Sequence, residues 1–152
     1  ALKANELAGS GLSFDKVINQ TEHFIHEMGT KFVLESLETL RKNGRLSTVT
    51  ATLASALNIK PVMTSNGNGE IDKVTQARGM SKAIIKMADA IKADAVDPQN
   101  HTLMIAHCNN RKRAEFVKEE ILKRLSFKDV QITETGGISS LYAADGGIVV
   151  CY

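Results

Sequence analysis

Cysteine is scarce in this sequence, because only Cys108 and Cys151 occur among its 152 residues. Cys108 lies in an apolar run and Cys151 lies at the end of the chain. This pattern argues against a disulfide framework and favours a reducing compartment. We therefore expect the protein to be cytoplasmic.

An excess of one charge and long apolar runs are also missing. The 19 Lys and Arg residues nearly balance the 17 Asp and Glu residues, for a net charge of +2. Such a balance provides no broad basic field for nucleic acid and no acidic tail. No signal peptide pattern opens the sequence, and no apolar run approaches the roughly 20 residues that cross a bilayer. We expect no nucleic acid partner and no transmembrane segment.

At 152 residues, the chain is long enough to form one domain with a hydrophobic core of its own. The chain begins at Ala1, without a methionine, and directly in a helical pattern. We therefore expect it to be a fragment of a longer protein.

Two segments carry clear helical periodicity. Residues 13–29 predict an amphipathic helix with Ser13 as N-cap and Gly29 as its stop. Residues 80–93 carry apolar side chains at i, i+4, i+7 and i+11, which is a helical stripe. The apolar faces consist of Phe14, Val17, Ile18, Thr21 and Ile25 in the first segment, and Met80, Ile84, Met87 and Ile91 in the second.

The remaining signals alternate between helix and strand. Pro61 forces Lys60 to be extended, and the run Asn66-Gly67-Asn68-Gly69 tolerates positive φ, so a hairpin is expected at 58–74. The count of about six strands and five helices predicts an α/β (α+β) domain of two layers. The other predicted helices span 35–44 and 111–125, and the other strands 31–34, 101–108, 130–136 and 146–152.

Residues 46–59, LSTVTATLASALNI, contain no charged residue. A helix without a polar face must be covered on several sides. It is either a core helix whose Thr and Ser hydroxyls return to backbone carbonyls, or the wall of a slot for a long apolar ligand. The segment alone favours core burial.

The flanking motifs favour the ligand slot. The stretches FVLESLETLRKNGRLS (32–47), ASALNIKPVMT (54–64), ARGMSKAIIKM (77–87) and TLMIAHCN (102–109) occur in this order. Together they resemble the second domain of the DegV family, from about Lys31 to Tyr152. The resemblance implies a mixed sheet with helices packed on one face, following connecting helices (1–30) that leave a missing N-terminal domain.

The same resemblance implies a function. DegV proteins bind a long-chain fatty acid with the acyl tail inside the second domain, and some present it to a fatty acid kinase subunit. The chain would then be the noncatalytic tail-binding half of a carrier, with its own N-terminal domain as a further partner. The competing hypothesis is a protein-interaction or regulatory domain with a solid core and no ligand.

A tail slot would be lined by Leu53, Leu57, Met63, Ile84 and Met87. An acyl chain gains roughly 0.8 kcal/mol per methylene removed from water, so such a slot binds without charge. Methionines could adapt the slot to different chain lengths, although they are also ordinary core filler.

Three polar residues are candidates for the headgroup or for a partner. Arg78 precedes Gly79 at the start of a helix, and a guanidinium can hold a carboxylate or phosphate bidentately. Arg45 follows Gly44 and could equally cap a helix C-terminus. Tyr142 stands in YAADGG, where DegV proteins often carry His-x-Gly-Pro-Gly; tyrosine can donate a hydrogen bond but is no cation at neutral pH.

Other chemistry finds little support. The basic cluster Arg111, Lys112 and Arg113 is more simply the solvated opening of a helix than a docking patch. His23 and His26 lack a third metal ligand at suitable spacing, and His107 and Cys108 point to opposite faces of a strand. With no Walker loop or nucleophile elbow either, we expect no catalytic residue, metal or cofactor in this chain.

Overall fold

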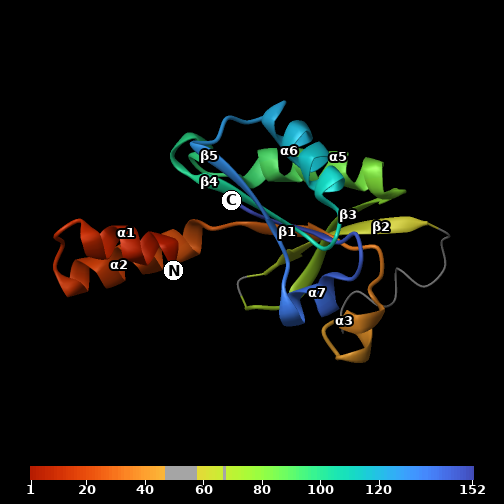
Figure 1. Cartoon of the computed structure of the whole chain (residues 1–152), viewed down its shortest axis with the longest axis horizontal. Helices are drawn as coiled ribbons and strands as arrows, with labels where there is room; N and C mark the ends of the chain where they lie inside the picture. Colours follow the sequence, from red (N-terminus) through yellow and green to blue (C-terminus); the bar gives the residue numbers. More distant parts are fainter. Residues whose placement is uncertain (47–57, 67) are drawn as a thin grey trace.

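A computed structural model describes residues 1–46, 58–66 and 68–152. Its centre is an open six-stranded sheet with the order β3-β2-β1-β6-β4-β5 (Figure 1). Neighbouring strands pair antiparallel except β4 and β5, which run parallel. The predicted mixed α/β sheet is thereby confirmed. The strands are β1 (Thr30–Val33), β2 (Ile59–Ser65), β3 (Ile71–Arg78), β4 (Thr102–His107), β5 (Asp129–Glu134) and β6 (Ile148–Cys151).

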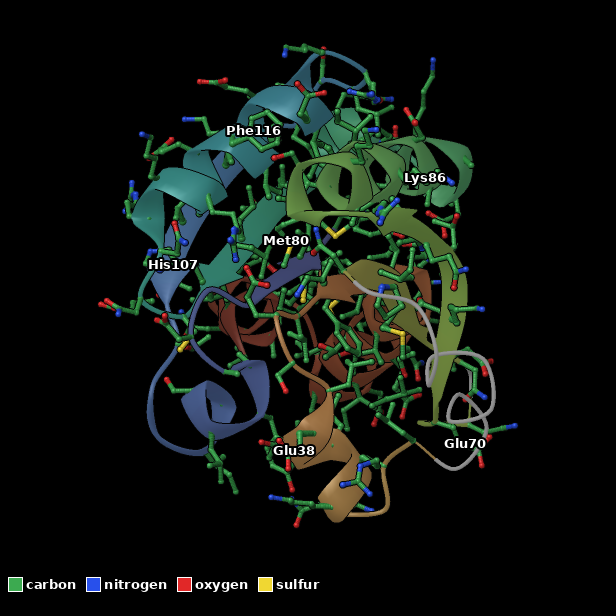
Figure 2. The ribbon with its side chains drawn as sticks, turned by 90° about the vertical axis from the view of Figure 1, so that its right-hand side faces the viewer. Glu38, Glu70, Met80, Lys86, His107 and Phe116 are labelled. Carbon is green, nitrogen blue, oxygen red and sulfur yellow. The ribbon has the colours of Figure 1, made fainter. Side chains whose placement is uncertain are left out.

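One face of the sheet is covered by α5 (Met80–Asp94) and α6 (Arg111–Leu122), which lie side by side (Figures 1 and 2). α5 begins after Gly79, whose φ of 82° suits glycine, and its predicted stripe faces the strands. α6 is capped by the Asn110 side chain, which accepts a hydrogen bond from the Arg113 backbone N–H. Each fully buried aliphatic side chain here contributes about 1.5–3 kcal/mol. This core includes Val33, Val62, Ile84, Met87, Ile91, Leu103, Ile105, Val117, Ile121, Ile148 and Val150.

A smaller apolar cluster lies where the short helices α3 (Glu38–Lys42) and α7 (Gly137–Ala143) pack near β1 and β2. Strand alternation separates it from the larger core, because Val62 and its neighbour Met63 point to opposite faces. The short helices α3 and α7 therefore lie against the face of the sheet opposite to α5 and α6. We call this group the α3–α7 cluster; it consists of Leu34, Leu40, Leu46, Met63 and Ala143, with Phe32, Leu37, Ile71, Cys108 and Tyr142 packed against it.

The first two helices form an arm that projects from the sheet (Figure 1). This helical arm consists of α1 (Leu2–Gly9) and α2 (Phe14–Glu27), so the predicted helix at 13–29 is confirmed. Its predicted apolar face is only partly covered by the described part of the chain, since Val17 and Thr21 are half-buried. Phe14 is 77% exposed and Ile25 is 56% exposed.

Most of the uncharged segment, residues 47–57, lies outside the described residues, as do both interpretations of it. The structure resumes at Asn58, and β2 and β3 form the predicted antiparallel hairpin with a bulge between Val62 and Met63. A short 3-10 helix, η1 (Pro98–Asn100), leads into β4. In the described ranges, no helix combines the length and apolar character that a membrane span requires.

Candidate functional site

The predicted tail-lining residues lie on two faces of the sheet. Met63 is fully buried in the α3–α7 cluster. Ile84 and Met87 are buried under α5 on the opposite face. Leu53 and Leu57 lie outside the described residues. Because the sheet separates the two sets, one slot can be lined either by Met63 or by Ile84 and Met87.

Tyr142 is the predicted headgroup residue that the structure brings together with a predicted tail residue. It lies on α7, a helix that the glycine-rich sequence around it did not predict, and packs partly buried against the α3–α7 cluster with Met63. Its phenol thus stands at the rim of an apolar cluster, where a hydrogen-bond donor could meet the polar end of an apolar ligand.

Arg78 and Arg45 are exposed beside turns. Arg78 ends β3 opposite Ile59 and precedes the N-cap of α5. Arg45 follows Gly44, whose φ is 67°, and its backbone N–H donates to the Leu40 carbonyl at 2.9 Å. That bond closes α3 through the backbone, so the Arg45 guanidinium is not needed as its cap.

The turn at residues 144–147 fixes the end of α7. The Gly146 N–H donates to the Cys108 carbonyl at 2.9 Å, and the Cys108 N–H donates to the Gly147 carbonyl at 3.0 Å. A Cβ on Gly147 would lie 2.2 Å from the Ala143 carbonyl oxygen, so only glycine permits this approach. The Asn109 side chain adds a hydrogen bond to Asp145 at 3.0 Å.

A charged network reaches the same turn from three elements. The Arg113 guanidinium donates to the Gly146 carbonyl and, at 2.7 Å, to Glu35 Oε1. Lys60 Nζ lies 2.6 Å from Glu35 Oε2. Burial alone would raise the pKa of Glu35, but the hydrogen bonds from Lys60 and Arg113 outweigh it and lower that pKa. The solvated role predicted for Arg113 is therefore wrong, since its side chain is only 20% exposed.

Sequence reasoning missed this network because its members lie far apart in the chain. The spacing of residues within α6 gave one indication that Arg113 is partly buried. Arg113 is followed by the buried Ala114 and lies four residues before the buried Val117, so it borders the inward side of the helix.

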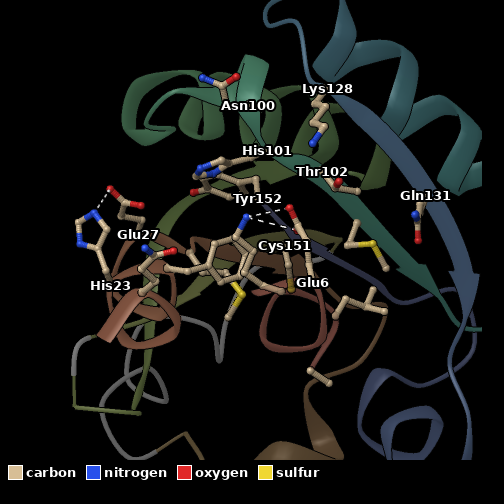
Figure 3. Close-up of a pocket in the computed structure, with 17 residues that line it drawn as sticks. Glu6, His23, Glu27, Asn100, His101, Thr102, Lys128, Gln131, Cys151 and Tyr152 are labelled. Atoms are coloured by element: carbon tan, nitrogen blue, oxygen red, sulfur yellow. Dashed lines mark hydrogen bonds and ion pairs between the residues drawn. The ribbon is translucent and has the colours of Figure 1, made fainter. Parts of the chain in front are cut away.

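A cleft of about 640 Å³ lies between the helical arm and the β4–β5–β6 part of the sheet (Figure 3). Its floor is mainly apolar, with Met104 and Cys151 from the sheet and Phe24 and Met28 from α2. The Phe24 ring lies 5.9 Å from the His101 ring, centroid to centroid. Polar groups stand at its margins, among them His23, Glu27, Asn100, Lys128 and Gln131.

A polar cluster adjoins this cleft through Tyr152, which lines it. Lys31, only 3% exposed, lies 2.5 Å from Asp94 and donates to the Tyr152 hydroxyl at 2.7 Å. That hydroxyl donates in turn to Asp94 at 2.6 Å. Burial and the adjacent Asp94 carboxylate raise the pKa of Tyr152 well above its ordinary value. The cluster ties β1 and the end of β6 to α5, and sequence reasoning missed it although Lys31 alternates with the buried Val33.

The described part of the chain contains neither a metal-binding cluster nor a disulfide bond. No group of three or more His, Cys, Asp and Glu side chains there is arranged to hold a metal ion. His23 pairs with Glu27 at 3.2 Å along α2, and both cysteines are free thiols.

Solved structures share this fold closely. A DegV family protein from Ruminococcus gnavus, refined with vaccenic acid, has a TM-score of 0.96 and 46% identity, over 99% of this chain and 54% of its own. The fatty acid kinase B3 protein of Streptococcus pneumoniae, loaded with linoleic acid, has a TM-score of 0.87 and 31% identity, over 99% and 53%.

Sequence comparison agrees with the structural one. A DegV domain-containing protein of Streptococcus pyogenes is 31% identical over 151 residues, which are 99% of this chain and 53% of the relative. The chain thus spans about half the length of the curated relatives that it matches. The family model described as uncharacterised protein, DegV family, matches residues 1–152, and the chain therefore belongs to the DegV family.

Proposed function

We propose that this chain is the acyl-tail-binding half of a long-chain fatty acid carrier. The observation that carries the proposal is the fit of 99% of the chain, at a TM-score of 0.96, to a relative refined with vaccenic acid. A further relative at 26% identity is loaded with heptadecanoic acid. Acids of this kind offer a long apolar tail and one carboxylate, which demand an apolar slot and a few polar groups at its rim.

The α3–α7 face of the sheet is the better location for the tail. There, the fully buried Met63 and the partly buried Tyr142 belong to one cluster, which joins a tail contact to a headgroup contact. This face also carries Leu46, the first residue of the uncharged segment that holds Leu53 and Leu57. Ile84 and Met87 would then support the strands from behind, within the larger core.

Tyr142, Arg78 and Arg45 are proposed as contacts for the headgroup or for a partner. Tyr142 would donate a hydrogen bond to the carboxylate. Arg78 and Arg45 are exposed, and a guanidinium is suited to carboxylate and phosphate oxygens alike. The two arginines therefore suit a protein that hands its ligand to a phosphorylating partner.

An N-terminal domain of the same protein is proposed to cover the helical arm. Phe14, Ile18 and Ile25 are exposed along α2, and a contiguous apolar face of this kind usually meets another surface. The solved relatives are about twice as long as this chain, which leaves room for such a domain. Residues 1–30 would then connect it to the domain at 31–152.

A fatty acid kinase is the proposed partner, because a relative of 31% identity is a fatty acid kinase B3 protein. Any acyl phosphate chemistry would then belong to the kinase rather than to this chain. The two free thiols agree with a location in the cytoplasm, where such a kinase would have its nucleotide.

Chain-length selectivity tests both the ligand and its location. In the natural protein that contains this chain, Met63→Ala should open space at the tail and shift preference toward longer acids. The affinity for the acid should increase about fourfold for each extra methylene group buried, because each such group contributes roughly 0.8 kcal/mol. The matched variant Met87→Ala should cost stability without shifting the preference, because its cavity lies in the larger core.

Competition binding with saturated acids of increasing length measures this preference. If Met87→Ala shifts the chain-length preference and Met63→Ala does not, the tail lies on the α5 face of the sheet instead. Absence of binding by the unaltered protein would instead favour an interaction domain with a solid core.

A further inference from the structure

Arg113 differs from the other basic residues at the start of α6. Its side chain is 20% exposed, whereas that of Arg111 is 62% exposed and, among the described residues, pairs with Glu115 one turn along the same helix. The partners of Arg113 come from outside its helix, namely Glu35 after β1 and the carbonyl of Gly146. Partly buried pairs of this kind are screened by salt less than surface pairs.

Gly146 is shaped for this contact. Its φ of 80° suits glycine, and a Cβ added to it would lie 2.5 Å from Arg113 Nη1. The guanidinium therefore occupies space that any larger residue at 146 would fill. Lys60 holds Glu35 from the other side, with its Nζ also donating to the Glu35 carbonyl at 2.8 Å.

The position of this turn is transmitted to Tyr142. Gly147 packs directly against the carbonyl of Ala143, the residue after Tyr142, and its N–H donates to the Ala144 carbonyl at 3.1 Å. The last turn of α7 therefore cannot move unless the 144–147 turn moves with it. α7 has only seven residues and lacks a side-chain cap, so its own hydrogen bonds hold it weakly.

We propose that Arg113 is a positioning residue, which holds the 144–147 turn between Glu35 and α6 so that the Tyr142 hydroxyl meets the ligand carboxylate. This inference rests on the proposed function. Arg113 does not itself touch the ligand; it acts through the Gly146 carbonyl and the end of α7. The exposed Arg111 on the same helix provides a matched control.

The test compares oleic acid with oleyl alcohol, which share a tail and differ in the headgroup. In the natural protein, Arg113→Met should weaken acid binding about tenfold, the order that one hydrogen bond to a charged group is worth. Alcohol binding should change less than about twofold, since the tail contacts are intact. Arg111→Met should change neither, and Arg113→Lys should behave as Arg113→Met because one ammonium cannot span both acceptors.

A double-mutant cycle decides whether Arg113 acts through Tyr142. In a Tyr142→Phe background, Arg113→Met should cost no further acid affinity. The inference would be overturned if Arg113→Met weakened the binding of acid and alcohol equally. It would also be overturned if Arg113→Met weakened acid binding as much in the Tyr142→Phe background as in the unaltered protein. If Arg113→Met does not fold, Glu35→Gln weakens the same link and carries the same expectations.

Hydrogen exchange of the amides at 141–147, without ligand, separates this inference from the proposed function. Protection lost in Arg113→Met and kept in Arg111→Met supports the link between Arg113 and the turn, and protection kept in both overturns it. An unaltered protein that takes up neither ligand refutes the proposed function, and with it the part of the inference that concerns the carboxylate.

Discussion

Ala144 has a backbone conformation that alanine rarely adopts. Its φ is 55° and its ψ is 169°, close to a region that is populated almost only by glycine. Ala144→Gly should therefore raise the free energy of unfolding by about 1 kcal/mol. Ala143→Gly is the matched control and should lower it by about 1 kcal/mol, because Ala143 is buried within α7.

Urea denaturation of the two variants measures this difference. If both glycines lower the stability equally, the Ala144 backbone is not strained and the turn has another conformation.

The buried Tyr152 hydroxyl makes stability depend on alkaline pH. Its pKa is raised in the folded chain by burial and by Asp94, while in the unfolded chain it ionises near about 10. The associated stability is therefore complete below pH of about 10 and is lost as the pH rises above it, because only the unfolded state then releases the proton.

Absorbance at the phenolate band checks this assignment. Up to a pH of about 11, Tyr152→Phe should show the same absorbance change as the unaltered chain, since Tyr152 stays protonated while the chain is folded. A smaller change in Tyr152→Phe than in the unaltered chain, as expected if Tyr152 ionised at its ordinary pKa, would contradict it.

At the scale of elements, the junction between the helical arm and β1 depends on Gly29. Gly29 and Tyr152 exchange two backbone hydrogen bonds, at 2.7 and 3.0 Å, and a Cβ on Gly29 would lie 2.4 Å from the Tyr152 ring. The ring cannot easily move, because Lys31 and Asp94 hold its hydroxyl. Gly29→Ala should cost about 1–3 kcal/mol, as overpacking of a buried site does.

Gly9→Ala is the control for this junction, since in the described part of the chain no atom from outside its own helix and neighbours lies within 4 Å of a Cβ built there, and its φ is not positive. It should leave the midpoint of thermal unfolding unchanged or slightly raised. Equal effects of the two substitutions would mean that the Tyr152 ring does not pack against Gly29.

The elements that could be predicted are those whose signal is local. The α5 stripe and the β2–β3 hairpin follow from periodicity and turn residues, and both are confirmed. α7 could not be predicted, because Gly136 and Gly137 disfavour helix and its stability comes from packing against distant residues such as Leu40 and Met63. The exposure of the α2 face was also unpredictable, since amphipathicity does not tell which surface covers a helix.

At the scale of the whole molecule, the apolar face of α2 gives the proposed N-terminal domain a direct test. In the 152-residue chain, Phe14→Glu with Ile25→Glu should change the free energy of unfolding by less than about 0.5 kcal/mol, because both side chains are exposed. In the complete natural protein, the same pair should lower it by several kcal/mol, because charges would be buried at the interface.

Chemical denaturation of both proteins makes the comparison. The exposed pair Lys82→Gln and Lys92→Gln on α5, which lowers the net charge by the same amount, serves as a control for the change in charge. An unchanged stability of the complete protein would mean that the α2 face is not covered by the rest of it.

The site was predictable only in part, for physical reasons. The ordered motifs between residues 32 and 109 indicated the family, but they could not tell which face of the sheet each apolar residue would join. Met63 and Met87 were both predicted to line one slot, and the structure places them in clusters on opposite faces of the sheet. Arg113 and Glu35 are 78 positions apart, so their ion pair depends on the fold and leaves no local pattern.

Native mass spectrometry of the purified natural protein, followed by lipid extraction, tests the central claim most directly. We predict a bound mass equal to a fatty acid of about 14 to 18 carbons, a length whose burial at roughly 0.8 kcal/mol per methylene holds it through purification. The bound acid should be released on unfolding and regained when oleate is added. A protein that is empty after purification and also fails to take up added oleate would contradict the claim.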